Sequence, residues 1–153
     1  MARRELAEEL LSTKHVVRLA TVGPGVGPHV VPLWFVWWRG RMYMLSVTRS
    51  RKMEHLRRGT RAAAVVDDGQ ETAEVRDRRL VLTDMRGVEL RGRVVDAEAE
   101  GDPKLPAVAR AWGRKYVGVE DFPPDGLANH TWIRLDPDQI SAWDYGTTGS
   151  AGT

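Results

Sequence analysis

A cluster of basic side chains in residues 46–61, SVTRSRKMEHLRRGTR, is the part of the sequence best suited to bind an anion. The cluster holds six Arg or Lys residues in a chain whose formal net charge is only +2. The spacing of its apolar residues predicts a short helix with Ser50 as the N-cap. Arg49, Arg51 and Lys52 would then crowd the positive end of the helix dipole. Cations beside free backbone N–H groups indicate a site for a phosphate or a carboxylate.

Three interpretations of this basic cluster compete. Charged helix faces are often simply solvated, and this accounts for Arg57 and Arg58, which the dipole favours at the C-terminal end of the helix, before Gly59. Nucleic-acid binding needs a broad basic face, which the near-neutral net charge opposes, so no nucleic-acid partner is expected. A phosphate cradle for a small cofactor needs only a local cluster, and the arrangement at residues 50–52 favours it.

Other arrangements of reactive residues have little support. The chain has no cysteine, which excludes disulfides, thiolate metal sites and cysteine nucleophiles. Its four histidines, at positions 15, 29, 55 and 130, lack the spacing of a metal site, so no metal is expected. His29 is a candidate proton donor, but a solvated histidine at the end of a strand is the favoured explanation. The catalytic residues are therefore unassigned.

The composition predicts a globular protein of the cytoplasm. Hydrophobic residues make up 42% of the chain and charged residues 29%, which is typical of soluble domains. The N-terminal segment contains acidic side chains and no long apolar core, so no secretory signal is expected. Residues 19–38 are uncharged over a length that could span a bilayer. The Pro and Gly residues within them predict a turn between strands instead, and no membrane partner is expected.

The elements that would position these residues are mostly short strands. An amphipathic helix is predicted to end near Thr13, and residues 69–85 are predicted to form a long loop or arm. A second helix is predicted at residues 103–118. Strands are predicted at residues 15–22, 29–38, 41–47, 61–68 and 86–97, with a last hairpin formed by 130–135 and 140–146. This order predicts a mainly β fold, a six- to seven-stranded antiparallel barrel with flanking short helices.

The second predicted strand is apolar on both faces. Trp34, Val36 and Trp38 point one way, and Phe35 and Trp37 point the other. A strand of an open, solvated sheet would be polar on one side, so both faces are expected to be covered. The barrel interior would cover one face, and a partner subunit or a planar ligand would cover the other.

Four segments of the sequence together resemble the pyridoxamine phosphate oxidase-like flavin-binding split barrels. They are RLATVGPGVGPHVVPLWFVW, GRMYMLSVTRSRKMEHLRRGTRAAAVVDDG, RGVELRGRV and WIRLDPDQISAWDYG. The most similar branch uses FMN or the deazaflavin coenzyme F420. The resemblance implies a split β-barrel and an oxidoreductase that transfers a hydride between F420 or FMN and a small unsaturated or quinone-like substrate. It leaves open a non-catalytic protein of the same fold that binds or stores flavin, F420 or haem.

The resemblance implies a phosphate site at the start of the short helix. In the family, a Ser-Arg-Lys element grips the cofactor phosphate, which implies this role for Ser50, Arg51 and Lys52. Ser46, on the preceding strand, matches a family hydroxyl near the same phosphate. The resemblance covers roughly residues 5–146. We expect one domain at residues 1–146 and a flexible tail at residues 147–153.

The resemblance also implies a ring site and a partner. Val31, Pro32 and Trp34 would line the ring of the cofactor, on a strand whose backbone faces the polar edge of that ring. The family is typically a homodimer with cofactor sites at the subunit interface. Trp143 stands where the partner often supplies an aromatic side chain.

The sequence departs from the family at three places. His55 stands where many relatives have asparagine, and residues 69–85 form a longer segment than usual. The C-terminal pattern with which true pyridoxamine phosphate oxidases bind the substrate phosphate is missing. That substrate is therefore not expected here.

Overall fold

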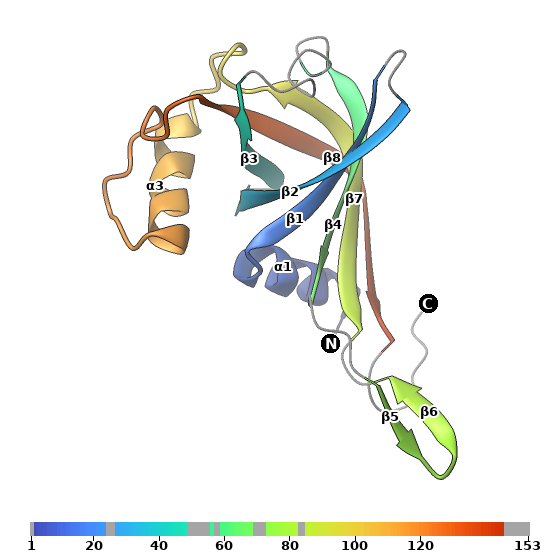
Figure 1. The fold of residues 1–153 in the computed structure, drawn as a ribbon. Coiled ribbons are helices and arrows are strands. Elements are labelled where there is room, and N and C mark those ends of the chain that lie inside the picture. Colours follow the sequence, from blue (N-terminus) through green and yellow to red (C-terminus); the bar gives the residue numbers. More distant parts are fainter. Residues whose placement is uncertain are drawn as a thin grey trace.

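The fold is a closed six-stranded antiparallel barrel that carries, among the residues described, the helices Arg3–Thr13 and Leu105–Tyr116 (Figure 1). A computed structural model describes residues 2–23, 27–48, 56, 59–68, 73–82 and 85–145. Around the barrel the strands follow the order β1, β2, β3, β8, β7, β4. Their bounds are β1 (Val16–Gly23), β2 (Gly27–Trp38), β3 (Arg41–Val47), β4 (Thr60–Asp67), β7 (Arg86–Asp96) and β8 (His130–Asp144). The mainly β antiparallel barrel predicted from the sequence is confirmed.

The first three strands form the predicted meander. β1 pairs with β2, and β2 with β3, both in antiparallel register. Alternate side chains of β1 are buried, namely Val17, Leu19 and Thr21, which is the period of a strand with one face on a core. The turn between β2 and β3 is made by Arg39 and Gly40, whose φ angles of 48° and 80° are both positive. Positive φ at both central residues is what a type I′ hairpin turn requires.

β8 is one continuous strand, so the hairpin predicted for residues 130–146 is wrong. Its first part pairs with β3 and most of its length pairs with β7. The segment DPDQ has the composition of a turn, but its Pro137 lies at a β-bulge opposite Gly92. A Cβ at residue 92 would collide with the carbonyl oxygen of Asp136. Glycine on the neighbouring strand therefore lets the proline remain within the sheet.

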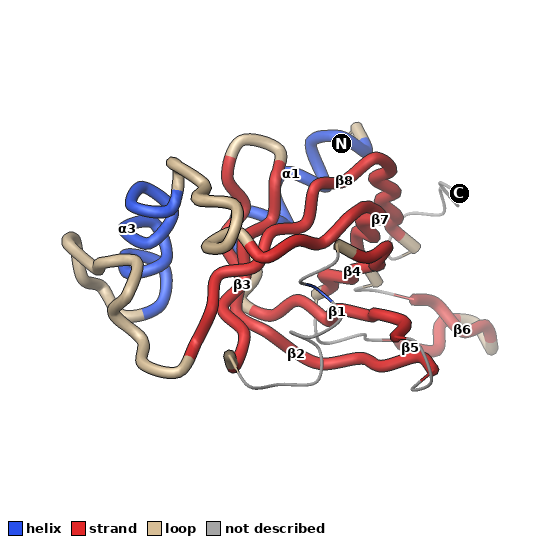
Figure 2. Tube along the Cα trace, turned by 90° about the horizontal axis from the view of Figure 1, so that it is seen from above, coloured by secondary structure: helices blue, strands red, loops and turns tan. Residues whose placement is uncertain are grey.

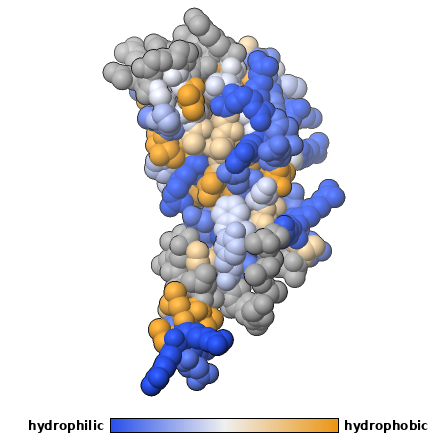
Figure 3. Space-filling view, turned by 90° about the vertical axis from the view of Figure 1, so that its right-hand side faces the viewer, coloured by the Kyte–Doolittle hydropathy of each residue, from blue (hydrophilic) through white to orange (hydrophobic). Residues whose placement is uncertain are grey.

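Residues 69–85, predicted as a long loop or arm, contain a two-stranded hairpin. β5 (Ala73–Arg76) pairs antiparallel with β6 (Arg79–Leu82). Its turn residues, Asp77 and Arg78, have φ angles of 49° and 65°, so the turn is of the tight type although it lacks glycine. The hairpin projects from the barrel (Figure 1), and apolar surface is exposed on it (Figure 3).

Two clusters of buried side chains join the barrel to its helices. The larger cluster fills the barrel interior, and α1 (Arg3–Thr13) contributes Leu6, Leu10 and Leu11 to it. The smaller cluster lies on the other face of β2 and β3, beneath α3 (Leu105–Tyr116), and includes Val36 and Trp112. Both faces of this part of β2 are covered, as predicted. However, α3 of the same chain provides the second cover, where the sequence suggested a partner subunit or a ligand.

α1 ends at Thr13, where the sequence predicts the end of a helix. α3 lies on the opposite side of the barrel from the β5–β6 hairpin (Figure 2). Within the described parts of the chain, no helix is long and apolar enough to cross a membrane. The short helix predicted after β3 falls mostly outside the described residues. Leu56 is buried there, and Gly59 has a φ of 66°, as expected just past the end of a helix.

Candidate functional site

β2 and β3 part from each other halfway along β2, close to most of the predicted site residues. β2 pairs with β1 along residues 27–34 and with β3 only along residues 35–38. Beyond that point β3 continues alongside β8, its other neighbour. Among the described strands, none pairs with the edge of residues 27–34 that faces β3 (Figure 1). This free edge leaves backbone polar groups available to a ligand.

The hydrogen bonds of Phe35 show which backbone groups face the free edge. Its N–H donates to the Tyr116 hydroxyl (N to Oη, 2.9 Å), and that hydroxyl donates to the carbonyl oxygen of His15 (2.7 Å). Phe35 therefore faces the β1 side. Because peptide groups alternate between the two edges of a strand, the free edge carries those of Pro28, Val30, Pro32 and Trp34. The two prolines lack an N–H, so this edge offers mainly carbonyl acceptors and resists pairing with another strand.

Val31, Pro32 and Trp34 lie on this stretch of β2. The side chains of Pro32 and Trp34 share one face of the strand, and that of Val31 lies on the other. Pro32 is exposed and Val31 is half-buried. Trp34 is 49% exposed and stacks on the Tyr116 ring of α3, with centroids 4.5 Å apart and planes at 3°. α3 thus fixes the orientation of Trp34 while part of the indole stays open to solvent. Contact of these side chains with a cofactor ring stays a prediction.

Ser46 lies across the split from these residues and carries an unpaired buried hydroxyl. If the β2–β3 ladder continued, Ser46 would pair with Leu33. Its side chain is fully buried, and its Oγ has no hydrogen-bond partner within the part of the chain that the structure describes. An unpaired hydroxyl in the interior costs about 1–3 kcal/mol. A polar partner at this end of the barrel would remove that cost.

Two threonines extend the polar end of the barrel around Ser46. Thr131 of β8 pairs with Ser46 in the strand ladder. The hydroxyls of Thr131 and Thr48 are hydrogen-bonded at 2.9 Å. The Thr48 N–H also donates to the carbonyl oxygen of Asn129 (2.9 Å). These bonds anchor the chain at the point where it leaves β3.

The basic segment that follows β3 is anchored to the barrel at both ends. Thr48 holds its start, and Leu56 is buried in the interior cluster. Ser50, Arg51 and Lys52 stand between these two anchors in the sequence. They lie outside the residues that the structure describes, so their role in phosphate binding stays a prediction.

Trp143 is far from Ser46 along the sheet. Its ladder partner is Gly87, and a Cβ at that glycine would collide with the indole. Thr131, the ladder partner of Ser46, precedes Trp143 by twelve residues, which corresponds to about 40 Å of extended strand. One chain therefore does not bring Trp143 and Ser46 together. The predicted role of Trp143 requires a second copy of the chain.

Sequence reasoning missed a half-buried amine, that of Lys115. Its Nζ donates to the Phe35 carbonyl oxygen (3.0 Å) and lies 3.8 Å from the centroid of the Phe35 ring. Burial lowers the pKa of Lys115 to about 8. The available signal was the basic pair Arg114 and Lys115 between Trp112 and Tyr116, on a predicted helix with an aromatic stripe.

Sequence reasoning also missed a buried polar network that joins α3 to the barrel. Asp102 accepts hydrogen bonds from the Tyr43 hydroxyl (2.7 Å), the Arg134 guanidinium (2.9 Å) and the Lys104 backbone N–H (2.9 Å). Burial opposes ionisation of Asp102, but these donors hold its pKa below the ordinary value. Burial, together with the bond to Asp102, raises the pKa of Tyr43 to about 12. All three side chains are buried, so we assign the network a structural role.

Similarity to known proteins identifies the family. The sequence matches the family described as pyridoxamine 5'-phosphate oxidase over residues 4–144. The chain belongs to this family. Membership in the pyridoxamine 5'-phosphate oxidase family confirms the resemblance on which the split-barrel fold was predicted. No curated protein matches the chain.

Among solved structures, three illustrate what this member of the pyridoxamine 5'-phosphate oxidase family resembles. The conserved hypothetical protein Rv2991 from Mycobacterium tuberculosis is 22% identical, with 100% of this chain and 93% of that chain covered and a TM-score of 0.67. An F420 reductase is 23% identical, with 88% and 94% covered and a TM-score of 0.59. The FAD and heme binding protein from Mycobacterium smegmatis is 21% identical, with 99% and 74% covered and a TM-score of 0.68. At these identities the likeness shows the fold alone.

Proposed function

We propose that this family member is an oxidoreductase that binds F420 or FMN and transfers a hydride between that cofactor and a small unsaturated or quinone-like substrate. The observation that carries the proposal is the split between β2 and β3, which sets a free strand edge opposite the unpaired hydroxyl of Ser46. A cofactor with a polar ring edge and a phosphate can use both features. The family match and the likeness to an F420 reductase support this assignment.

The phosphate part of the site would be formed by Ser46 and the segment that follows β3. A phosphate oxygen would accept a hydrogen bond from the Ser46 hydroxyl and so satisfy it. Ser50, Arg51 and Lys52 would supply further donors and the positive charge, as the family resemblance implies. Hydrogen bonds between cations and a phosphate are stronger than neutral ones. The residues present therefore fit a cofactor that carries a phosphate.

The ring part of the site would lie along the free edge of β2. Its carbonyl oxygens, together with the N–H groups of Val30 and Trp34, suit a ring edge that carries both amide N–H and C=O groups. When bound, a flavin or deazaflavin supplies the hydride transfer itself. Val31, Pro32 and Trp34 would orient the ring. The stack of Trp34 on Tyr116 would give the site a rigid apolar wall that limits access of water.

A second copy of the chain would complete the site. Trp143 is half-buried beside Gly87, and it cannot approach Ser46 of its own chain. In a homodimer, this indole could instead cover the cofactor bound to the other copy. Two such sites would then lie at the subunit interface, as the family resemblance implies.

A second candidate function is the binding or storage of flavin, F420 or haem without turnover. The likeness to the FAD and heme binding protein favours this alternative. Binding alone would use the same strand edge and the same hydroxyl. The two candidates therefore differ in turnover and not in the residues that hold the cofactor.

Titration of the purified 153-residue chain with FMN and with F420 tests the proposal. We expect saturable binding of at least one cofactor, which the change in the fluorescence of that cofactor would measure. The reduced cofactor should then be reoxidised on the protein when a small quinone such as menadione is added. Binding without oxidation by quinones or enones would support the storage alternative. If neither cofactor binds, the proposed oxidoreductase fails, and the alternative survives only if the chain binds haem.

Ser46→Ala tests the position of the phosphate, because we expect this variant to lose affinity for the cofactor without losing stability. Removing an unpaired buried hydroxyl should leave the free energy of unfolding unchanged or raise it slightly. The affinity for the cofactor should fall by about ten-fold, as when one charge-assisted hydrogen bond is lost. Ser141→Ala, at an exposed position of β8, is the matched control and should change neither quantity. An unchanged affinity in Ser46→Ala would place the phosphate elsewhere.

A further inference from the structure

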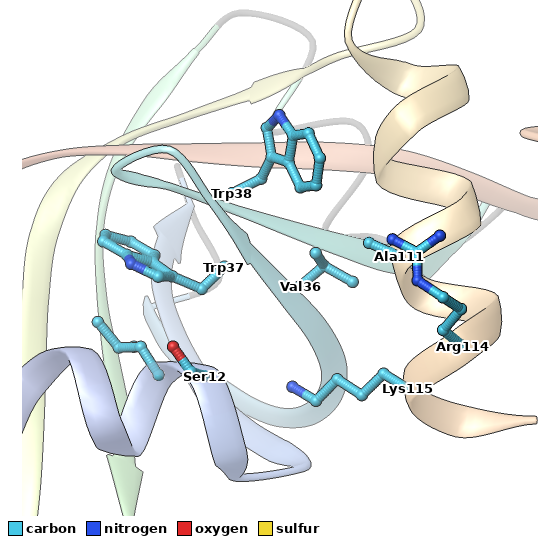
Figure 4. A pocket seen from close by; sticks show the side chains of 8 residues that line it. Ser12, Val36, Trp37, Trp38, Ala111, Arg114 and Lys115 are labelled. Atoms are coloured by element: carbon cyan, nitrogen blue, oxygen red, sulfur yellow. The ribbon is translucent and has the colours of Figure 1, made fainter. Parts of the chain in front are cut away.

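We infer that the chain has a second ligand site, in the cavity between α1, β2 and α3, and that this site takes a flat organic anion such as an aromatic carboxylate or sulfonate. The cavity has a volume of about 410 Å³. Its lining includes Ser12 of α1, Trp37 and Trp38 of β2, and Arg114 and Lys115 of α3 (Figure 4). The inference does not depend on the proposed cofactor, so the two can fail separately.

Arg114 and Lys115 bring two positive charges to this cavity. Among the residues that the structure describes, neither has a carboxylate within ion-pairing distance. Arg134, by contrast, is buried and bonded to three carboxylates. Arg114 is exposed and hydrated, but Lys115 is half-buried. A half-buried cation beside a cavity and without a counter-ion indicates that the missing charge comes from a ligand.

The amine of Lys115 is only partly satisfied by the protein. It donates to the Phe35 carbonyl oxygen (Nζ to O, 3.0 Å) and lies over the Phe35 ring. An ammonium group has three N–H donors, so donors remain for a ligand. Burial without a counter-ion lowers the pKa of Lys115 to about 8. An anion beside the amine would favour its charged form and offset this effect.

The helix dipole explains part of this arrangement. Arg114 and Lys115 lie in the last turn of α3, where the dipole favours cations. A lysine can gain that interaction while its amine stays in water. The Lys115 amine instead extends from α3 toward α1, beside β2 (Figure 4), and gives up part of its hydration. The dipole does not require this burial.

The walls of the cavity define the class of anion. Trp37, Trp38 and Val36 present apolar surface, much of it aromatic. The Trp37 indole N–H donates to the Glu8 carboxylate (Nε1 to Oε2, 3.0 Å). This hydrogen bond holds the indole ring in place and gives the Glu8 carboxylate a donor. A flat ligand with one anionic group would place this group at Lys115 and its apolar body against the Trp37 indole. The volume of the cavity is in the range of small-molecule sites.

Titration with anilinonaphthalene sulfonate, a fluorescent flat anion, tests the inference. The chain should bind it saturably, with a rise in its fluorescence. Lys115→Met keeps the apolar stem and removes the charge, and we expect the affinity to fall by about ten-fold or more. Arg110→Gln, at an exposed position of the same helix outside the cavity lining, should change the affinity by less than about two-fold. Equal affinity of Lys115→Met and the unaltered chain, or equal losses in both variants, would overturn the inference.

A matched pair of competitors tests the class of ligand. Naphthoate should displace the fluorophore, whereas naphthalenemethanol, which has the same rings without the charge, should do so far less effectively. Equal displacement by the two would show that the cations do not bind the ligand and would overturn the assigned class. Thermal unfolding of Lys115→Met, which should match that of the unaltered chain or exceed it, checks that a loss of binding reflects the charge and not the fold.

Discussion

The Ser46 hydroxyl and the Lys115 amine are both held inside the protein with fewer partners than they can use, counted over the described residues. Most buried polar groups in proteins are paired, as Asp102 is here by three donors. A ligand can form hydrogen bonds to a buried polar group that is not fully paired, and the protein loses none of its own hydrogen bonds. Changes at Ser46 and Lys115 should therefore affect ligand binding more than folding.

The stability of the chain should rise with pH between about 8 and 10 because of Lys115. Burial lowers its pKa from 10.5 to about 8 in the folded protein. Within that interval the folded state has released the proton while the unfolded state still binds it, so a rise in pH favours folding. Urea unfolding at several pH values should show a smaller rise for Lys115→Met than for the unaltered chain.

The other titratable groups around Lys115 set the limits of this measurement. Arg114 and Tyr116 adjoin it on α3, His15 packs edge-on against Tyr116, and Glu8 reaches the cavity wall through its bond to Trp37. Burial raises the pKa of Tyr116 to about 12, which should lower stability above about pH 10 in both chains. The difference between the two chains therefore isolates Lys115. An identical pH dependence in both would contradict the expectation.

At the scale of elements, α3 should depend on Asp102 as well as on apolar packing. Asp102→Asn should lower the free energy of unfolding by about 1.5–3 kcal/mol, because it weakens one charge-assisted bond of the buried Arg134 guanidinium, which keeps Glu100 and Asp136. Asp138→Asn is the control, since Asp138 pairs with Arg61 at the surface, where ion pairs contribute little. Urea unfolding measures both. A loss no larger for Asp102→Asn than for the control would contradict the structural role of this network.

Elements with a clear local pattern could be predicted from the sequence, and those that depend on a neighbour could not. β1 and α3 follow from their own periodicity. The continuity of β8 depends on a bulge opposite Gly92, on a different strand, so the local segment DPDQ alone predicts a turn. The β5–β6 turn uses Asp77 and Arg78 at positive φ, where glycine or asparagine is the usual signal.

The candidate site shows the same limit. Val31, Pro32 and Trp34 share one strand, and Ser46 follows on the next. The family resemblance, which follows the order of the sequence, was enough to select these four residues, which lie near the split. The cavity around Lys115 is built by α1, β2 and α3, which are distant in the sequence. The helical pattern around Lys115 is compatible with either an exposed or a buried amine, so the pattern does not predict the burial of this charge.

At the scale of the whole molecule, the closed barrel sets Ser46 opposite the free edge of β2 and keeps Trp143 away from both the hydroxyl and its neighbours on β3. Under the proposed function, the complete site therefore belongs to two copies of the chain. The phosphate end would be built by one copy alone, because Ser46 and the segment after it are contiguous in the sequence. The strength of phosphate binding is then the property that tests the account without reference to the dimer.

The dissociation constant of FMN or F420 in variants of the basic segment provides that test. Arg51→Gln and Lys52→Met should each weaken binding by about 1.5–3 kcal/mol, the contribution of a charge-assisted hydrogen bond. Arg57→Gln should weaken it much less, because the helix dipole and solvent already account for a cation at that end. This pattern is the result that the account predicts. Equal losses in all three variants would indicate diffuse electrostatic attraction and would contradict a phosphate site at Ser50, Arg51 and Lys52.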